Sequence, residues 1–217
     1  MRNVCLKYGL PHPLELLQNP MPKVRFKKLV KSKIAEFWHR QLSSEVKSLS
    51  SLAYFSSSYH SLLLPHPLWT TAGSNPHEVN KATILARMVS GRYRTERLCR
   101  FWTDNRHGYC LAPGCYQVVG DLQHLLIDCP ALEPARSNLC HMWISKAASI
   151  PPLLQLVTRV LVSPAVTRMK FILDPTSMPE IIQLSQDIGW QVIETVFYMS
   201  RTYAYGLHRK KLIVVGK

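Results

Sequence analysis

The sequence is poor in acidic side chains. Its 217 residues include 13 Asp and Glu against 27 Lys and Arg, which gives a formal net charge of +14 at pH 7. Such an excess attracts polyanions, because each phosphate that a cation neutralises releases a condensed counterion. The composition therefore favours a polyanionic partner.

Cysteines and long apolar stretches are also scarce. Six cysteines in 217 residues are too few for a disulfide scaffold, and a chain of this length can bury a core without one. Three prolines and an arginine interrupt the most apolar window, residues 150–166, so no transmembrane helix is predicted. The first twenty residues lack the apolar run of a signal peptide. We predict a protein that is not secreted, has no membrane partner, and works in the nucleus or cytoplasm.

One short stretch concentrates metal-ligating residue types. The segment "CLAPGCYQVVGDLQHLLIDC", residues 110–129, has the spacing Cys-x4-Cys-x8-His-x4-Cys. A Pro113-Gly114 turn can bring the first two thiolates to one point. Pro130 should end the short helix that carries the histidine and let the last cysteine turn back. The predicted zinc ligands are Cys110, Cys115, His124 and Cys129.

Four protein ligands leave no open position for water, so the spacing favours structural over catalytic zinc. The alternative is that these are four unligated core residues, because the first spacing is looser than the usual Cys-x2-Cys turn. If His124 does not bind, His107 and His141 are the substitutes to test. Residues 110–140 contain one arginine against three acidic residues, so the zinc module itself is acidic.

The positive charge lies in other segments. Residues 1–40 hold nine basic and two acidic side chains, and residues 75–109 hold seven and three. A basic amphipathic helix is predicted within residues 24–38. Its lysines either contact phosphates or form a solvated face: Lys27, Lys28, Lys31 and Lys33.

A second basic region follows. Asn75 and Pro76 predict a helix start with Glu78 in a capping box, and another short helix should begin near Thr95. We expect Leu98, Phe101 and Trp102 to cluster, leaving the arginines outside. Arginines with a tyrosine among them are suited to binding phosphates and stacked bases. The alternative is that these arginines only make two short helices soluble. The predicted nucleic-acid surface is Arg87, Arg92, Tyr93, Arg94, Arg97, Arg100 and Arg106.

The predicted fold class is mainly α, a helical domain with a small CCHC zinc-knuckle insert. We divide it into a basic amphipathic segment (1–45), a Ser-rich linker (46–74), Arg-rich helices with the knuckle (75–140) and a C-terminal helical region (141–217). In the last region, residues 188–203 carry two nearly opposite apolar stripes. That helix is either central in the core, or it docks a polymerase body or another copy of the chain.

The stretch "ARMVSGRYRTERLCRFW", the cysteine-histidine array and "QHLLIDCPAL" together resemble the region just downstream of the reverse transcriptase in proteins of animal non-LTR retrotransposons. The resemblance implies that the four ligands bind zinc. It also implies that the region helps a polymerase hold template RNA and target DNA as part of a larger protein.

Polymerase chemistry is not expected in this chain. It has no Tyr-x-Asp-Asp or Phe-x-Asp-Asp motif, so the two-metal carboxylate site is missing. Some relatives carry a nuclease beyond the knuckle, which draws attention to Asp174 and Glu180, but no Glu-x-Lys or Asp-x-Lys follows them.

We therefore expect no enzyme. The expected function is a zinc-braced accessory region that binds RNA, single-stranded DNA or both. The alternative is a zinc-stabilised protein-interaction module whose basic surface meets acidic proteins.

Overall fold

The computed structural model describes residues 2–49, 52, 54–55 and 65–215, and these are mainly helical, as predicted. The described residues form no β-strand, and their one isolated bridge pairs Tyr109 with Val119. The chain divides into two compact units. The first unit is residues 1–50 with 57–65, and the second unit is residues 51–56 with 66–217.

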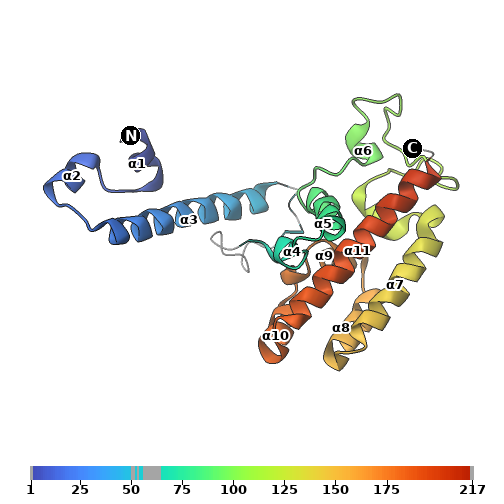
Figure 1. The fold of residues 1–217 in the computed structure, drawn as a ribbon. Helices are drawn as coiled ribbons and strands as arrows, with labels where there is room; N and C mark the ends of the chain where they lie inside the picture. The colour runs from blue at the N-terminus through green and yellow to red at the C-terminus, as the bar shows by residue number, and fades with distance from the viewer. Residues whose placement is uncertain (1, 50–51, 53, 56–64, 216–217) are drawn as a thin grey trace. The chain divides into compact units, whose positions relative to one another are not determined.

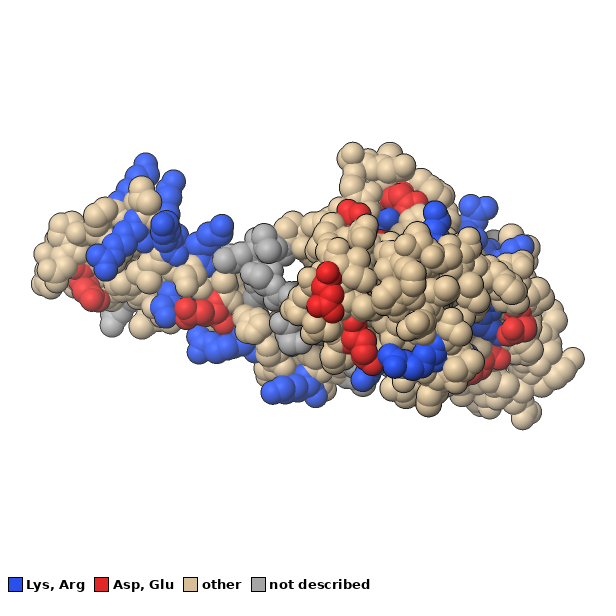
Figure 2. Space-filling view, turned by 90° about the horizontal axis from the view of Figure 1, so that it is seen from below, with Lys and Arg blue, Asp and Glu red and all other residues tan. Residues whose placement is uncertain are grey.

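The first unit contains α1 (Arg2–Tyr8), α2 (Pro13–Gln18) and α3 (Lys23–Ser48). Helix α3 is the predicted basic helix, extended at its C-terminal end, and it has no buried residue. The ring of Phe37 contacts those of Tyr8 and Trp38 at centroid distances of 5.1 and 5.3 Å. Figure 2 shows Lys and Arg gathered along this unit with few acidic side chains.

The predicted linker, residues 46–74, is structured at both ends. Helix α3 continues to Ser48, and α4 (Pro67–Thr70) begins the second unit. Leu68 and Ala72 are buried in the core. The serine-rich composition predicted a loop here and gave no indication of this burial. Residues 50–51, 53 and 56–64 of the predicted linker lie outside the described residues.

The second unit continues with α5 (Pro76–Val89) and α6 (Glu96–Cys99), which start where the sequence predicts. The Asn75 side chain accepts a hydrogen bond from the His77 amide at 2.9 Å, and Thr95 caps α6. Glu78 does not complete a capping box. Its carboxylate instead bonds Lys81 and Arg201.

Helix α11 (Gln191–Val214) is the centre of the second unit. It packs against α5, α7 (Glu133–Ala147), α9 (Ala165–Leu173) and α10 (Pro179–Ile188), and α8 (Pro151–Leu161) packs on α7 (Figure 1). The predicted helix over residues 188–203 is interrupted at Gly189, because α10 ends at Ile188 and α11 begins at Gln191. Within α11 both apolar stripes are buried, with Val196 of one and Phe197 of the other fully inaccessible, whereas Trp190 just before it is 47% exposed. The prediction of a central core helix is confirmed for α11, and within this helix neither stripe is left for a partner.

A buried ion network fastens α11 to α4 and α5. The Arg201 guanidinium, 5% exposed, donates to Glu78 at 2.7 Å, to the Thr71 hydroxyl at 2.9 Å and to the Thr71 carbonyl at 3.1 Å. Lys81 donates to the other Glu78 oxygen at 2.7 Å. Because every charge in the group has a partner, its burial is tolerated.

Candidate functional site

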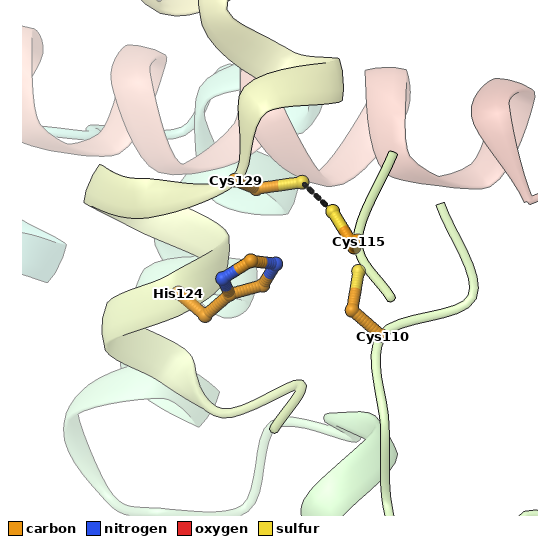
Figure 3. A group of neighbouring side chains, drawn as sticks. All are labelled: Cys110, Cys115, His124 and Cys129. Atoms are coloured by element: carbon orange, nitrogen blue, oxygen red, sulfur yellow. Dashed lines mark hydrogen bonds between the residues drawn. The ribbon is translucent and has the colours of Figure 1, made fainter. Parts of the chain in front are cut away.

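The four predicted metal ligands converge. One ligand atom from each of them lies within 4.8 Å of those of the others, and the Sγ atoms of Cys115 and Cys129 are 3.6 Å apart. Sulfurs around a tetrahedral zinc lie about 3.8 Å apart, because each Zn–S bond is about 2.3 Å. Figure 3 shows the imidazole of His124 facing the three sulfurs. This cluster could hold a metal ion.

Two cysteines come from a hairpin-like loop. The Cys110 amide donates to the Val118 carbonyl at 2.8 Å beside the Tyr109–Val119 bridge. Between the cysteines, the Cys115 amide donates to the Ala112 carbonyl at 3.2 Å, which closes the predicted Pro113-Gly114 turn. Gly114 has φ of +81°, the conformation that such a turn requires of its third residue.

The other two ligands come from a turn of π-helix, His124–Asp128. The Asp121 carboxylate accepts from the His124 amide at 2.8 Å at the start, and the Cys129 amide donates to the His124 carbonyl at 2.7 Å at the end. Before Pro130, Cys129 leaves the helical conformation with φ of −62° and ψ of 114°, as predicted.

This turn belongs to the core of the second unit. Leu125, Leu126 and Ile127 are buried, and the Tyr203 hydroxyl of α11 donates to the Leu126 carbonyl at 2.8 Å. The buried Arg136 of α7 donates to the Cys129 carbonyl at 2.7 Å. The sequence predicts the zinc site as an insert in the helical domain. Its His124–Cys129 half is instead part of the core, whereas its Cys110–Cys115 half is a loop that contacts the core through Ala112 and Cys115.

Burial sets the protonation of the cluster. It raises the pKa of the Cys110 thiol to about 12 and raises that of Cys129, while it lowers the pKa of the His124 imidazole. Near pH 7 the thiols of Cys110 and Cys129 are therefore protonated and the His124 imidazole is neutral. A divalent cation would displace the thiol protons, since the thiolate is the ligand.

One buried ring nitrogen of the cluster has no hydrogen-bond partner among the described residues. His124 is 6% exposed, and its Nε2 has no hydrogen-bond partner within the described part of the chain. A cavity of about 10 Å³ lies beside Cys110, His124 and Cys129. Its volume is close to the least that holds one water molecule. A metal ion would satisfy the Nε2 atom.

The two substitute histidines do not join the cluster. His107 is exposed and stacks on Tyr109 at a centroid distance of 5.2 Å, and His141 is exposed on α7. Asp174 is buried and accepts hydrogen bonds from Thr176, and Glu180 lies 3.6 Å from Arg159. Asp174 therefore caps a turn and Glu180 lies beside an arginine, and neither contact indicates a nuclease site.

The predicted arginine surface is exposed, with one exception among its members. All six arginines are exposed, and in the described ranges only Arg97 forms an ion pair, to Asp121 at 3.6 Å. Tyr93 is only 8% exposed, and its hydroxyl lies 3.0 Å from His208 Nδ1. Burial raises the pKa of this phenol. The expectation that Tyr93 stacks on bases is wrong, because its ring is packed inside.

The lysines of the first unit are exposed or half-buried on α3. Lys27, Lys28 and Lys31 are exposed, whereas Lys33 pairs with Glu36 at 2.9 Å. They remain available for a polyanion, although α3 shows no second feature that would select one.

Two aromatic side chains that we expected to cluster are open to solvent. Phe101 is 74% and Trp102 is 76% exposed, and Leu98 is 38% exposed. Helix α6 ends at Cys99 after four residues, so helical spacing does not extend to these rings. The early end of α6 could not be foreseen from the apolar pattern, and sequence reasoning missed both rings as surface residues.

Comparisons with models of known protein families, with curated proteins and with solved structures find no match. Among the described residues, no helix combines the length and the apolar character needed to span a bilayer.

Proposed function

We propose that this chain is a nucleic-acid-binding module braced by one structural zinc ion. The observation that carries the proposal is the convergence of Cys110, Cys115, His124 and Cys129, with their ligand atoms within 4.8 Å and the His124 Nε2 otherwise unpartnered within the described residues. Three thiolates and one imidazole suit zinc better than magnesium or calcium, which prefer oxygen ligands.

A structural role follows from the closed ligand set. Four protein ligands complete a tetrahedron, so no position remains for a reactive water. The ligands also join two separate pieces of backbone, the Cys110–Cys115 loop and the His124–Cys129 turn. The metal's contribution is therefore to hold that loop on the core.

Nucleic acid is the partner that the charge distribution favours. The chain has a formal net charge of +14, and the arginines of α5, α6 and the loops that follow each of them are exposed beside few acids. The resemblance of residues 86–102 and 123–132 to the region downstream of retrotransposon reverse transcriptases points the same way. In that setting the module would assist the polymerase body of a larger protein, or another copy of the chain, in holding RNA or single-stranded DNA.

The first test replaces Arg94, Arg97 and Arg100 with alanine. We expect weaker binding of a single strand in any sequence, because phosphate contacts carry no sequence information. Each lost contact should flatten the plot of log affinity against log salt by about 0.7, so the triple variant should lose about 2 from the slope. Fluorescence polarisation of a labelled oligonucleotide across a salt series measures both quantities.

The matched control replaces Lys146, Arg159 and Lys170, which are also exposed, and should leave the slope nearly unchanged. An equal loss in both variants would mean that only total charge matters. An unchanged slope in the arginine variant would move the contact to the lysines of α3.

The second candidate function is binding of an acidic protein, which the same exposed arginines would favour. An acidic peptide tested beside RNA and single-stranded DNA at physiological salt separates the two. Tighter binding of the peptide would replace our proposal, whereas heparin would not discriminate, because any polyanion satisfies the charge.

A further inference from the structure

The loop after α6 presents an aromatic pair to solvent. Phe101 and Trp102 are 74% and 76% exposed, although aromatic rings of this size are ordinarily buried. They are adjacent in sequence, and the guanidinium of Arg100 lies 4.7 Å from the centre of the Phe101 ring. The pair therefore combines flat apolar faces with a cation at the same place.

The backbone beneath these rings is held in place. The Trp102 amide and the Thr103 hydroxyl both donate to the Cys99 carbonyl, at 2.9 and 3.2 Å. The side-chain amide of Asn105 closes the far end of the loop with two hydrogen bonds to the backbone of Tyr109, at 2.6 and 3.1 Å. A fixed backbone keeps both rings at the surface without a large loss of entropy on binding.

The loop is also seated on the metal-binding hairpin. The Arg97 amide donates to the Gly120 carbonyl at 3.2 Å. A Cβ atom on Gly108 would lie 2.7 Å from the Arg97 Cα, and one on Gly120 would lie 2.7 Å from a Glu96 carboxylate oxygen. Glycine at these two positions allows α6 to approach the hairpin that carries Cys110 and Cys115.

Charge complementarity identifies the occupant. Within ten residues of the rings lie Arg92, Arg94, Arg97, Arg100 and Arg106, against the exposed Asp104 and against Glu96, which Lys211 neutralises at 2.9 Å. An apolar protein partner would not need this many cations, whereas a single strand presents phosphates and open base faces together. Stacking on aromatic side chains with basic neighbours is how single strands are held without sequence preference.

We infer that Phe101 and Trp102 form a stacking platform for unpaired bases, with Arg100 and its neighbouring arginines on the phosphates. This inference rests on the proposed function and specifies its ligand as unpaired RNA or DNA, since duplex bases are already stacked on each other. The metal takes no part in the contact, but it holds the hairpin on which the platform is seated.

The test measures binding of fluorescein-labelled dT20 and rU20 to the full chain by polarisation. Phe101→Ala and Trp102→Ala should each weaken binding by about 5- to 150-fold, the range for loss of one base stack. The salt slope should stay unchanged, because no phosphate contact is lost. Phe101→Tyr and Trp102→Phe, which keep an aromatic face, should restore most of the affinity. The control is Trp190→Ala, a 47% exposed tryptophan at the start of α11.

An oligonucleotide of the same length without bases separates stacking from charge. The alanine variants should bind it as tightly as the unchanged chain does. A second measurement does not depend on the alanine variants folding: the single strand should quench tryptophan fluorescence in the unchanged chain, and Trp102→Phe should remove most of that quenching.

Three results would overturn the inference. If the alanine variants bind dT20 as the unchanged chain does, or lose the base-free strand equally, the rings do not stack on bases, while the proposed function stands. If they lose binding of an acidic peptide and keep that of the strand, the platform is a protein-docking site. If the unchanged chain binds no strand at all, the proposed function fails together with the platform.

Discussion

Replacing Cys129 with serine should abolish stoichiometric zinc binding. A serine hydroxyl remains protonated at neutral pH and is a poor zinc ligand, so the affinity should fall by more than the about 10- to 100-fold typical of changes outside the ligand shell. Elemental analysis of protein purified without chelator should give one zinc per unchanged chain and almost none per variant. Cobalt substitution should report three sulfurs and one nitrogen in the unchanged chain.

The same variant should loosen one half of the site more than the other. Among the described residues, the backbone hydrogen bonds of residues 108–120 run within the hairpin or to Asn105 and Arg97, not to the core helices α7 and α11, so their amides should lose protection from hydrogen exchange. The turn at His124–Asp128 should remain protected, because Tyr203 and Arg136 hold it from the core. Binding of dT20 should weaken as well, since the aromatic pair is seated on the hairpin.

Cys140→Ser is the control, because Cys140 is half-buried on α7 and is not a member of the four-residue cluster. It should keep both the zinc and the exchange pattern. A metal-free unchanged chain would contradict the zinc proposal. Loss of protection throughout α7 to α11 would contradict the division of the site into a loop half and a core half.

Zinc binding should weaken as the pH falls. Protons compete with the metal for thiolates, and burial already raises the pKa values of Cys110 and Cys129, so each step to lower pH makes displacement of those protons costlier. Competition with a chromophoric chelator between pH 8 and pH 6 measures the trend. A pH-independent affinity would mean that fewer thiols bind the metal than we propose.

Replacing Arg201 with methionine should lower the free energy of unfolding of the second unit by about 3–5 kcal/mol, because the ion network loses one of its two cations and the three hydrogen bonds that the guanidinium donates. Glu78 would retain only Lys81, and both hydrogen bonds to Thr71 would be lost. In a domain of this size, that change should lower the melting temperature by about 6–20 °C. Thermal unfolding followed by circular dichroism gives the value.

Arg159→Met is the matched control. Arg159 faces Glu180 at 3.6 Å in an exposed pair, with side-chain exposures of 64% and 51%, and such pairs contribute about 0–1 kcal/mol. Equal melting temperatures for the two variants would show that the buried network does not stabilise α11. Adding Glu78→Gln to Arg201→Met should deepen the loss, since the buried ammonium of Lys81 would then lack its carboxylate.

The difference in melting temperature between the Arg201→Met variant and the unchanged chain should also depend on pH. Burial by itself would raise the pKa of Glu78, but hydrogen bonds from Lys81 and Arg201 bring it below its ordinary value of 4.5. A lowered pKa in the folded state stabilises the fold above pH 4.5 and loses that contribution as the pH falls through the lowered value. The two melting temperatures should therefore converge in acid.

Local signals in the sequence predicted much of the fold. Asn75 with Pro76 located the start of α5, and Pro113 with Gly114 located the turn between two ligands, because capping and turn chemistry act over a few residues. The double apolar stripe of α11 indicated burial on both sides. The four residues that could hold a metal ion were found from spacing and residue type alone.

Contacts between distant residues could not be predicted in this way. Glu78 fits a capping box by its spacing, but a buried arginine more than a hundred residues later takes its carboxylate. Tyr93 was predicted to be a surface ring because arginines surround it in the sequence. In the structure it is buried, and its hydroxyl contacts His208, which lies more than a hundred residues away. Phe101 and Trp102 were predicted to cluster on a helix, but they are exposed, since α6 ends too early to bring them to the core.

The short connection between the two halves of the metal site has a consequence for its evolution. Eight residues, 116–123, separate Cys115 from His124, and the entropy lost in closing a flexible loop rises by only about 0.6 kcal/mol for each doubling of its length. Extra residues near Tyr116, which is 88% exposed, would therefore cost little metal affinity. Related chains should therefore tolerate insertions near Tyr116, before Gly120. Replacement of Gly108 or Gly120 by any larger residue should not be tolerated, because a Cβ atom there would clash with α6.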